Sequence, residues 1–171
     1  MRLILLVFIL FLHVNAKNLD FDSISSDFTQ TITSPEGSKI KYEGTFYAKK
    51  PYLALWHYTK PIEKSIYISN KDVLVVEPEL DQVIVSKMEN MPNISSILKN
   101  AKKISKNLYQ TSFEDVVYNI LVKNDKPESI SYMDKLENKV SIDFSKTKIN
   151  IKLKDNLFLY QIPKGYDIIR Q

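Results

Sequence analysis

Residue types that commonly catalyse reactions or bind metals are scarce in this sequence. Cysteine is absent from all 171 residues, which excludes disulfides, thiol catalysis and cysteine-bound metals. After residue 16 the chain has a single histidine, His57, so a histidine cluster for zinc is excluded as well. Gly37, Gly44 and Gly165 are too far apart in the sequence to build a phosphate-binding loop.

His57 and the carboxylates give little support to an enzyme. His57 has no neighbouring nucleophile and the chain has no GxSxG motif, so we interpret it as a strand residue that faces solvent or makes a core hydrogen bond. Glu77, Glu79 and Asp81 surround Pro78 without the glycine and terminal glutamate of a calcium loop, which favours a solvated turn. The sequence predicts a protein that is not an enzyme and needs no cofactor or metal.

The first sixteen residues have the pattern of a secretory signal peptide. Arg2 precedes an apolar run from Leu3 to Leu12, and Val14-Asn15-Ala16 is similar to a small-residue cleavage site. We expect cleavage after Ala16, which leaves residues 17–171 as a single exported domain. No later segment approaches the roughly 18 apolar residues of a membrane helix. The formal net charge is +4 with both signs scattered, which argues against a nucleic-acid partner.

Alternating apolar residues predict antiparallel strands joined by short turns. The predicted strands are 28–33, 39–49, 53–58, 65–68, 73–76, 83–85, 108–113, 116–122, 129–133, 140–144, 149–153 and 158–162. Gly44 lies among bulky neighbours on one face of its strand, which indicates a bulge or the close approach of another backbone. Residues 53–58 are apolar on both alternating faces, so this strand is either buried on both sides or lines an apolar cavity. We hypothesise that it forms one wall of a lipid-binding pocket.

Two segments have helical spacing instead. In residues 18–26, Asn18 or Asp20 can cap a short helix in which Phe21, Ile24 and Phe28 recur on one side. In residues 88–106, one face is apolar and the opposite face is polar and basic. The apolar face consists of Ile94, Ile97, Leu98, Ala101 and Ile104. Such a helix must lay its apolar face on the sheet, so the predicted class is α+β with one dominant antiparallel sheet.

Several short motifs follow one another in a recognisable order. Gly44-x-Phe46 precedes Lys50-Pro51-x-Leu53-x-x-Trp56-His57-Tyr58, then Pro61, then Glu77-Pro78-x-Leu80-x-Gln82-Val83. Further motifs are Phe28-Thr29-Gln30, Pro92 with Ile97-Leu98, and Phe158 with Pro163 and Gly165-Tyr166-Asp167. Each motif alone is weak, but the ordered set resembles the LolA family, the periplasmic carriers of lipoproteins.

This resemblance implies a fold and a function. The fold is an incomplete, strongly curved antiparallel β-barrel in which helices cover an apolar concave face and act as a lid. The function is that of a periplasmic carrier, which we expect to be a monomer. It would take lipoproteins from the inner-membrane transporter LolCDE, enclose their acyl chains, and deliver them to an outer-membrane acceptor, LolB or its equivalent. LolB is itself a lipoprotein of similar fold, so the absence of cysteine fits LolA and not LolB.

The resemblance also suggests which residues contact the cargo. The predicted cargo-binding residues are Phe28, Ala54, Trp56, Tyr58, Met88, Ile94, Ile97 and Leu98. Lys50 stands where the family usually carries an arginine that ties the lid shut, and we predict Lys50 as the lid latch. Ala54 stands at a position that is often aromatic, so the pocket is either larger or filled by Tyr58 or Met88.

Two alternatives remain at this point. The first is a carrier or sensor of another lipid or glycolipid on the same scaffold, because a fold does not determine its cargo. The second is a secreted enzyme such as a glycosidase, which requires two carboxylates about 5 to 9.5 Å apart in a polar cleft.

Overall fold

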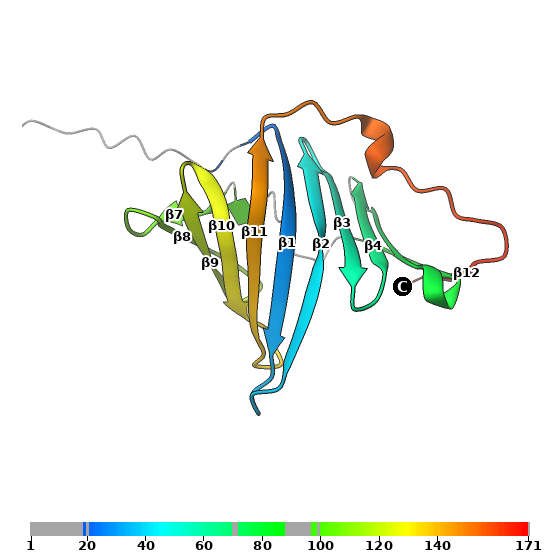
Figure 1. Cartoon of the computed structure of the whole chain (residues 1–171), viewed down its shortest axis with the longest axis horizontal. Helices are drawn as coiled ribbons and strands as arrows, with labels where there is room; N and C mark the ends of the chain where they lie inside the picture. Colours follow the sequence, from blue (N-terminus) through cyan, green and yellow to red (C-terminus); the bar gives the residue numbers. More distant parts are fainter. Residues whose placement is uncertain (1–18, 20, 70–71, 88–96, 99, 171) are drawn as a thin grey trace, which may run out of the picture.

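A single 12-stranded sheet dominates the fold in the computed structural model, which describes residues 19, 21–69, 72–87, 97–98 and 100–170 (Figure 1). The strands are β1 (Ser23–Thr33), β2 (Lys39–Lys49), β3 (Leu53–Lys60), β4 (Lys64–Ser69), β5 (Asp72–Glu77), β6 (Gln82–Lys87), β7 (Lys102–Lys103), β8 (Leu108–Phe113), β9 (Val116–Lys123), β10 (Lys126–Met133), β11 (Lys139–Ile149) and β12 (Asp167–Arg170). Two short 3-10 helices, η1 (Pro78–Leu80) and η3 (Asp155–Phe158), accompany them.

The strand order is β12-β6-β5-β4-β3-β2-β1-β11-β10-β9-β8-β7. Neighbouring strands are antiparallel except for β12, which runs parallel to β6 at one edge. The edge strands β12 and β7 are not paired with each other, so the barrel is incomplete, as expected. Tight hairpins connect many neighbours, and the turns Glu114-Asp115 and Asn124-Asp125 have the positive φ angles that two-residue hairpin turns need.

Aromatic contacts across skipped strands show that the sheet is strongly curved. The ring centroids of Phe46 on β2 and Phe144 on β11 are 6.1 Å apart, although β1 lies between these strands. Trp56 on β3 lies 6.5 Å from Phe144, with β2 and β1 between them. In a flat sheet these strands would be about 10 and 14 Å apart. The face that carries these rings is therefore concave, and we call it the concave face.

The concave face holds the main hydrophobic core. Its buried members are Leu19, Ile24, Phe28, Phe46, Ala48, Ala54, Tyr58, Ile68, Val73, Ile97, Leu98, Ala101, Tyr109, Tyr118, Ile120, Val122, Ile130, Val140, Ile142 and Phe144. They come from strands across most of the sheet and from the segment before β7. The core thus forms because the sheet curves around one of its faces.

The C-terminal segment covers part of the opposite, convex face. Residues 150–166, which we call the strap, follow β11 and lead to β12 at the far edge of the sheet (Figure 1). The strap contains η3, which contacts β3 and β4. Leu55, Val76, Val83 and Phe158 are buried outside the concave core. The strap is fastened near its start, where the Lys49 ammonium donates to the Leu153 carbonyl at 3.2 Å. Strand β3 is therefore covered on both faces, which explains its doubly apolar pattern.

The predicted helix over residues 18–26 is wrong, because Ser23 to Ser26 begin strand β1. Ser23 and Ser26 are buried strand residues whose hydroxyls find partners across the sheet. The Ser26 hydroxyl donates to the Ser145 carbonyl at 2.8 Å, and the Ser23 hydroxyl donates to the Ile151 carbonyl. Side-chain hydrogen bonds of this kind let short polar residues occupy a buried strand.

The predicted helix over residues 88–106 is too long. Ile97, Leu98 and Asn100 are helical, whereas Lys102–Lys103 form β7 and pair with β8. The backbone N–H of Ile104 donates to the Leu108 carbonyl at 2.8 Å in the turn that follows, so a helix cannot continue to residue 106. Residues 88–96 lie outside the described part of the chain.

The α+β class and the predicted helices over the concave face are likewise not supported, since the described residues contain no complete α-helix. None of their helical segments is long and apolar enough to cross a membrane. The predicted strands 149–153 and 158–162 are also wrong, because β11 ends at Ile149 and the strap leaves the sheet to cross its convex face. The predicted signal peptide lies outside the described residues.

Replacing Phe158 with alanine tests the strap. Phe158 is 2% exposed, whereas its neighbour Leu159 is 67% exposed. We expect Phe158→Ala to lower the free energy of unfolding by about 3 to 5 kcal/mol, because a buried ring is removed. Leu159→Ala, the matched control, should change it by less than about 0.5 kcal/mol. Urea denaturation of both variants measures the difference, and equal small effects would show that the strap adds no stability.

Candidate functional site

An aromatic patch forms the centre of the concave face. Its members are Phe28 on β1, Phe46 on β2, Trp56 on β3 and Phe144 on β11. Trp56 packs edge-on against Phe28 at 4.9 Å and at a tilt against Phe46 at 4.2 Å. Such contacts add about 0.5 to 1.5 kcal/mol per pair to the burial of the rings. Four strands therefore present one continuous aromatic surface.

Gly44 allows the strands beneath this patch to approach closely. A Cβ atom at residue 44 would lie 2.1 Å from the His57 carbonyl oxygen and 2.9 Å from a ring carbon of Phe28. The β2–β3 ladder also shifts its register between Glu43 and Gly44. The predicted bulge and close backbone approach at Gly44 are both confirmed. A side chain here would force the β2–β3 pair apart or displace the Phe28 ring.

The structure brings most of the predicted cargo-binding residues together. Six of the eight lie in or against the concave core, namely Phe28, Ala54, Trp56, Tyr58, Ile97 and Leu98. Met88 and Ile94 lie outside the described residues. Ile104, expected on the same helix face as Leu98, is instead 57% exposed. The six residues thus share one surface, and their role in binding stays a prediction.

Sequence reasoning missed other residues of this surface. Phe46 and Phe144 complete the aromatic patch, and Tyr42, Tyr118 and Tyr132 lie on the same face. Strand alternation was the available signal, because it places Tyr42 and Phe46 on the face of Gly44. It could not identify Phe144 or Tyr132 as their neighbours, since strands distant in sequence meet here only through curvature.

Lys50 lies at the bend between β2 and β3. Its ammonium is 3.1 Å from the Asp22 carboxylate, and its backbone N–H donates to the Asp22 carbonyl at 2.9 Å. Both side chains are largely exposed, so the ion pair itself contributes little to stability. Through its backbone N–H and its ammonium, Lys50 contacts Asp22, the residue directly before β1.

Burial also affects the chemistry of two tyrosines on the concave face. Burial raises the pKa of Tyr132 to about 12, with smaller contributions from Tyr118 and Asp134. Burial likewise raises the pKa of Tyr58, whose hydroxyl donates to the Gln30 side chain at 3.0 Å. Both phenols therefore keep their protons at neutral pH and act as hydrogen-bond donors.

His57 points to the opposite side of the sheet. Its Nδ1 atom lies 2.9 Å from the Ser65 hydroxyl, beside a hollow of about 440 Å³ under the strap. This hydrogen bond agrees with the interpretation of His57 as a strand residue with a local partner. In the described residues, no three His, Asp or Glu side chains come close enough to hold a metal.

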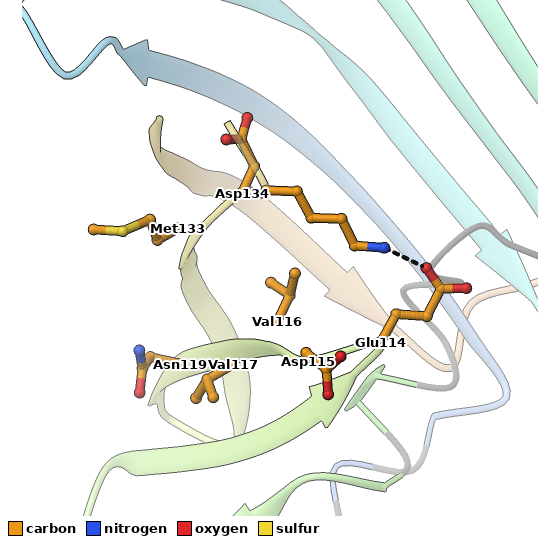
Figure 2. A pocket seen from close by; sticks show the side chains of 8 residues that line it. Glu114, Asp115, Val116, Val117, Asn119, Met133 and Asp134 are labelled. Atoms are coloured by element: carbon orange, nitrogen blue, oxygen red, sulfur yellow. Dashed lines mark hydrogen bonds and ion pairs between the residues drawn. The ribbon is translucent and has the colours of Figure 1, made fainter. Parts of the chain in front are cut away.

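Another hollow, of about 590 Å³, lies between the β8–β9 and β10–β11 turns (Figure 2). Met133 and Val117 line it together with carboxylates, and the Glu114 carboxylate pairs with the Lys135 ammonium at 3.0 Å. It lies at the hairpin ends, away from the aromatic patch. We place the candidate site on the concave face, because that is where apolar side chains from many strands converge.

An open, strongly curved sheet with an aromatic concave face defines a class of binding proteins that hold apolar ligands on a β-scaffold. Residues 20–116 match the family described as "Outer membrane lipoprotein carrier protein LolA". The chain belongs to the LolA family.

Relatives and solved structures agree with this assignment. An outer-membrane lipoprotein carrier protein of Wolinella succinogenes is 39% identical over 87% of both chains. One of Campylobacter jejuni is 36% identical over 99% of this chain and 100% of its own length. The structure of a LolA superfamily protein from Nitrosomonas europaea superposes with a TM-score of 0.52, at 15% identity, over 85% of this chain and 94% of that one. This last likeness concerns the fold alone.

Adding a methyl group at residue 44 tests the close approach. We expect Gly44→Ala to lower the free energy of unfolding by about 3 kcal/mol, because the new Cβ would overlap the His57 carbonyl. Gly37→Ala is the control, since Gly37 has open space around it and only its positive φ angle opposes a side chain. That strain should cost about 1 kcal/mol. Thermal denaturation compares the variants, and a smaller loss for Gly44→Ala would contradict the steric argument.

Proposed function

We propose that this protein is a periplasmic carrier that takes lipoproteins from the inner-membrane LolCDE transporter and delivers them to an outer-membrane acceptor, LolB or its equivalent. The observation that carries the proposal is the convergence of aromatic and aliphatic side chains on the concave face of a LolA-family chain. The relatives named outer-membrane lipoprotein carrier protein support the same cargo. The predicted signal peptide, cleaved after Ala16, would place the protein in the periplasm. We also propose that the carrier acts as a monomer.

The concave face has the chemistry to hold acyl chains. Burying hydrocarbon contributes about 0.8 kcal/mol per methylene group, so a chain of roughly fifteen carbons gains about 12 kcal/mol when fully enclosed. That free energy suffices to extract a lipid anchor into water. It would also trap the anchor, so a carrier needs a way to weaken its own binding.

The binding of acyl chains would be weakened if a segment of the protein competed with them for the concave face. Ile97, Leu98 and Ala101 are buried against the same core as the aromatic patch, so they occupy surface that acyl chains would cover. We propose that their segment is the lid, and that it leaves the face when cargo enters and returns when cargo departs. The free energy of lid closure is then subtracted from that of lipid binding.

We further propose that Lys50 latches this arrangement. Its contacts with Asp22 hold the chain just before β1, and Leu19 in that region is buried in the concave core. A few hydrogen bonds of about 1 to 3 kcal/mol are enough to shift the balance between the closed and cargo-bound states. The latch would act through the N-terminal segment, which Asp22 connects to Lys50.

The alternative function is that of a carrier or sensor for another lipid or glycolipid on the same scaffold. Mass spectrometry of ligands that co-purify with the protein separates the two: acylated polypeptide supports the lipoprotein carrier, and free lipid supports the alternative. A glycosidase is disfavoured at this site, because the concave face is lined by apolar and aromatic side chains and is not a polar cleft.

A charge on the concave face should abolish transport. We expect Leu98→Glu and Trp56→Glu to lose all detectable release of lipoprotein from inner-membrane vesicles, because a carboxylate on this face repels acyl chains. Ile104→Glu is the matched control, since Ile104 comes from the same predicted apolar stripe but is exposed. It should retain normal release. Unchanged release by the first two variants would remove both residues from the site.

Removing the latch should affect cargo transfer more than stability. We expect Lys50→Ala to change the free energy of unfolding by less than about 1 kcal/mol, because the ion pair is exposed. It should also slow delivery of bound lipoprotein to the acceptor several-fold, because the closed state that expels cargo is weakened. Lys50→Arg, which keeps the charge, should deliver normally. Normal delivery by Lys50→Ala would show that Lys50 is not the latch.

A further inference from the structure

Four tyrosines form a row across the concave face. Tyr42 on β2 and Tyr58 on β3 have ring centroids 5.9 Å apart, and Tyr118 on β9 and Tyr132 on β10 have centroids 4.8 Å apart. Tyr132 is opposite Val140 on β11, which in turn is opposite Ile32 on β1. Ile32 is opposite Ile40, two residues before Tyr42, so the two pairs lie at the same level of the sheet. All four residues lie in or against the concave core. We call them the tyrosine row.

Most hydroxyls of the tyrosine row have unused donor capacity. Tyr58 donates to Gln30, but among the described residues no partner accepts a hydrogen bond from Tyr42, Tyr118 or Tyr132. No side-chain oxygen in the described residues is both fully buried and unpartnered. Each of these three hydroxyls is therefore accessible to solvent, where a ligand can meet it.

The row lies at one end of the aromatic patch. On β2, Tyr42 precedes Phe46 by four residues, and Tyr132 stands opposite Val140, four residues before Phe144 on β11. Four strand residues span about 13 Å. Over this distance the side chains on the concave face change from tyrosines with hydroxyl groups to phenylalanines without them. A ligand that matches this surface has a polar, hydrogen-bond-accepting end joined to long hydrocarbon.

We infer that the tyrosine row binds the ester and amide carbonyl oxygens at the head of the cargo's acyl chains and so fixes the direction in which the lipid lies. The inference rests on the proposed carrier function. A carbonyl oxygen drawn out of water onto a purely hydrocarbon wall would lose its hydrogen bonds. Phenols that remain protonated at neutral pH replace those bonds, because they donate and carbonyl oxygens accept. The hydrocarbon tails then extend toward Phe46, Trp56 and Phe144.

Two synthetic lipopeptides that differ only at the carbonyls test this inference. One probe is a cysteine peptide carrying a diacylglyceryl group with ester links, and the other is its dialkyl ether analogue of equal chain length. Trp56 is the only tryptophan in the chain and lies in the aromatic patch, so its emission reports binding of either probe. We expect the protein to bind the ester probe about two- to tenfold more tightly for each hydrogen bond formed.

Removing hydroxyls should reduce this preference. We expect the double variant Tyr42→Phe/Tyr132→Phe to lose most of the preference for the ester probe, because two of the three available hydroxyls are removed, with affinity for the ether probe unchanged. Tyr47→Phe is the matched control, because Tyr47 lines the hollow under the strap on the other side of the sheet. It should keep the full preference.

The possible results separate the inference from the proposed function. Equal binding of both probes by the unaltered protein, or an undiminished preference in the double variant, would overturn the tyrosine row while leaving a lipid carrier intact. Binding of neither probe would overturn the carrier function together with the inference. A preference that is largely lost in the double variant but kept by the unaltered protein and by Tyr47→Phe supports both the carrier function and the tyrosine row.

Discussion

The fold depends on how closely β2 and β3 approach at Gly44. The His57 carbonyl and the Phe28 ring occupy the space that a side chain would fill there. This contact bends the sheet where its aromatic residues are densest, and it lets Trp56 and Phe144 meet from strands three positions apart. The concave face and its apolar surface follow from that curvature. Glycine at residue 44, with a hydrogen atom in place of a side chain, thus permits the close approach on which the concave face is built.

Burial on both faces gives β3 a special place in the sheet. Ala54 and Tyr58 are buried in the concave core, while Leu55 is buried on the opposite side, where the strap crosses. The proposed cargo would replace only the contacts on the concave face, so the strap side keeps β3 in position whether or not a ligand is present. The proposed lid residues Ile97 and Leu98 are buried against the concave core.

The sequence predicted the strands well where local chemistry determines them, and poorly where long-range packing does. Turn residues and alternation identified the hairpins from β1 to β6 and from β8 to β11. The spacing of Phe21, Ile24 and Phe28 indicated a helix. The strand forms instead because the hydroxyls of Ser23 and Ser26 find partners more than 100 residues away, which local spacing does not reveal. The strap imitated a strand, since alternating residues that cover a convex face resemble residues that pair. The aromatic patch was half predicted, because Phe144 joins it only through curvature.

The open edges of the sheet have a mechanical consequence. Strands β7 and β12 end the sheet without pairing to each other, so no backbone ladder closes the barrel. A closed barrel could widen only by breaking a row of interstrand hydrogen bonds, whereas this sheet can flatten while every ladder stays intact. The elastic resistance to widening then comes from the aromatic contacts between skipped strands and from the strap. The stiffness of the scaffold is therefore set by side chains. Substitutions in the core can change the distance between the two sheet edges without altering the strand order.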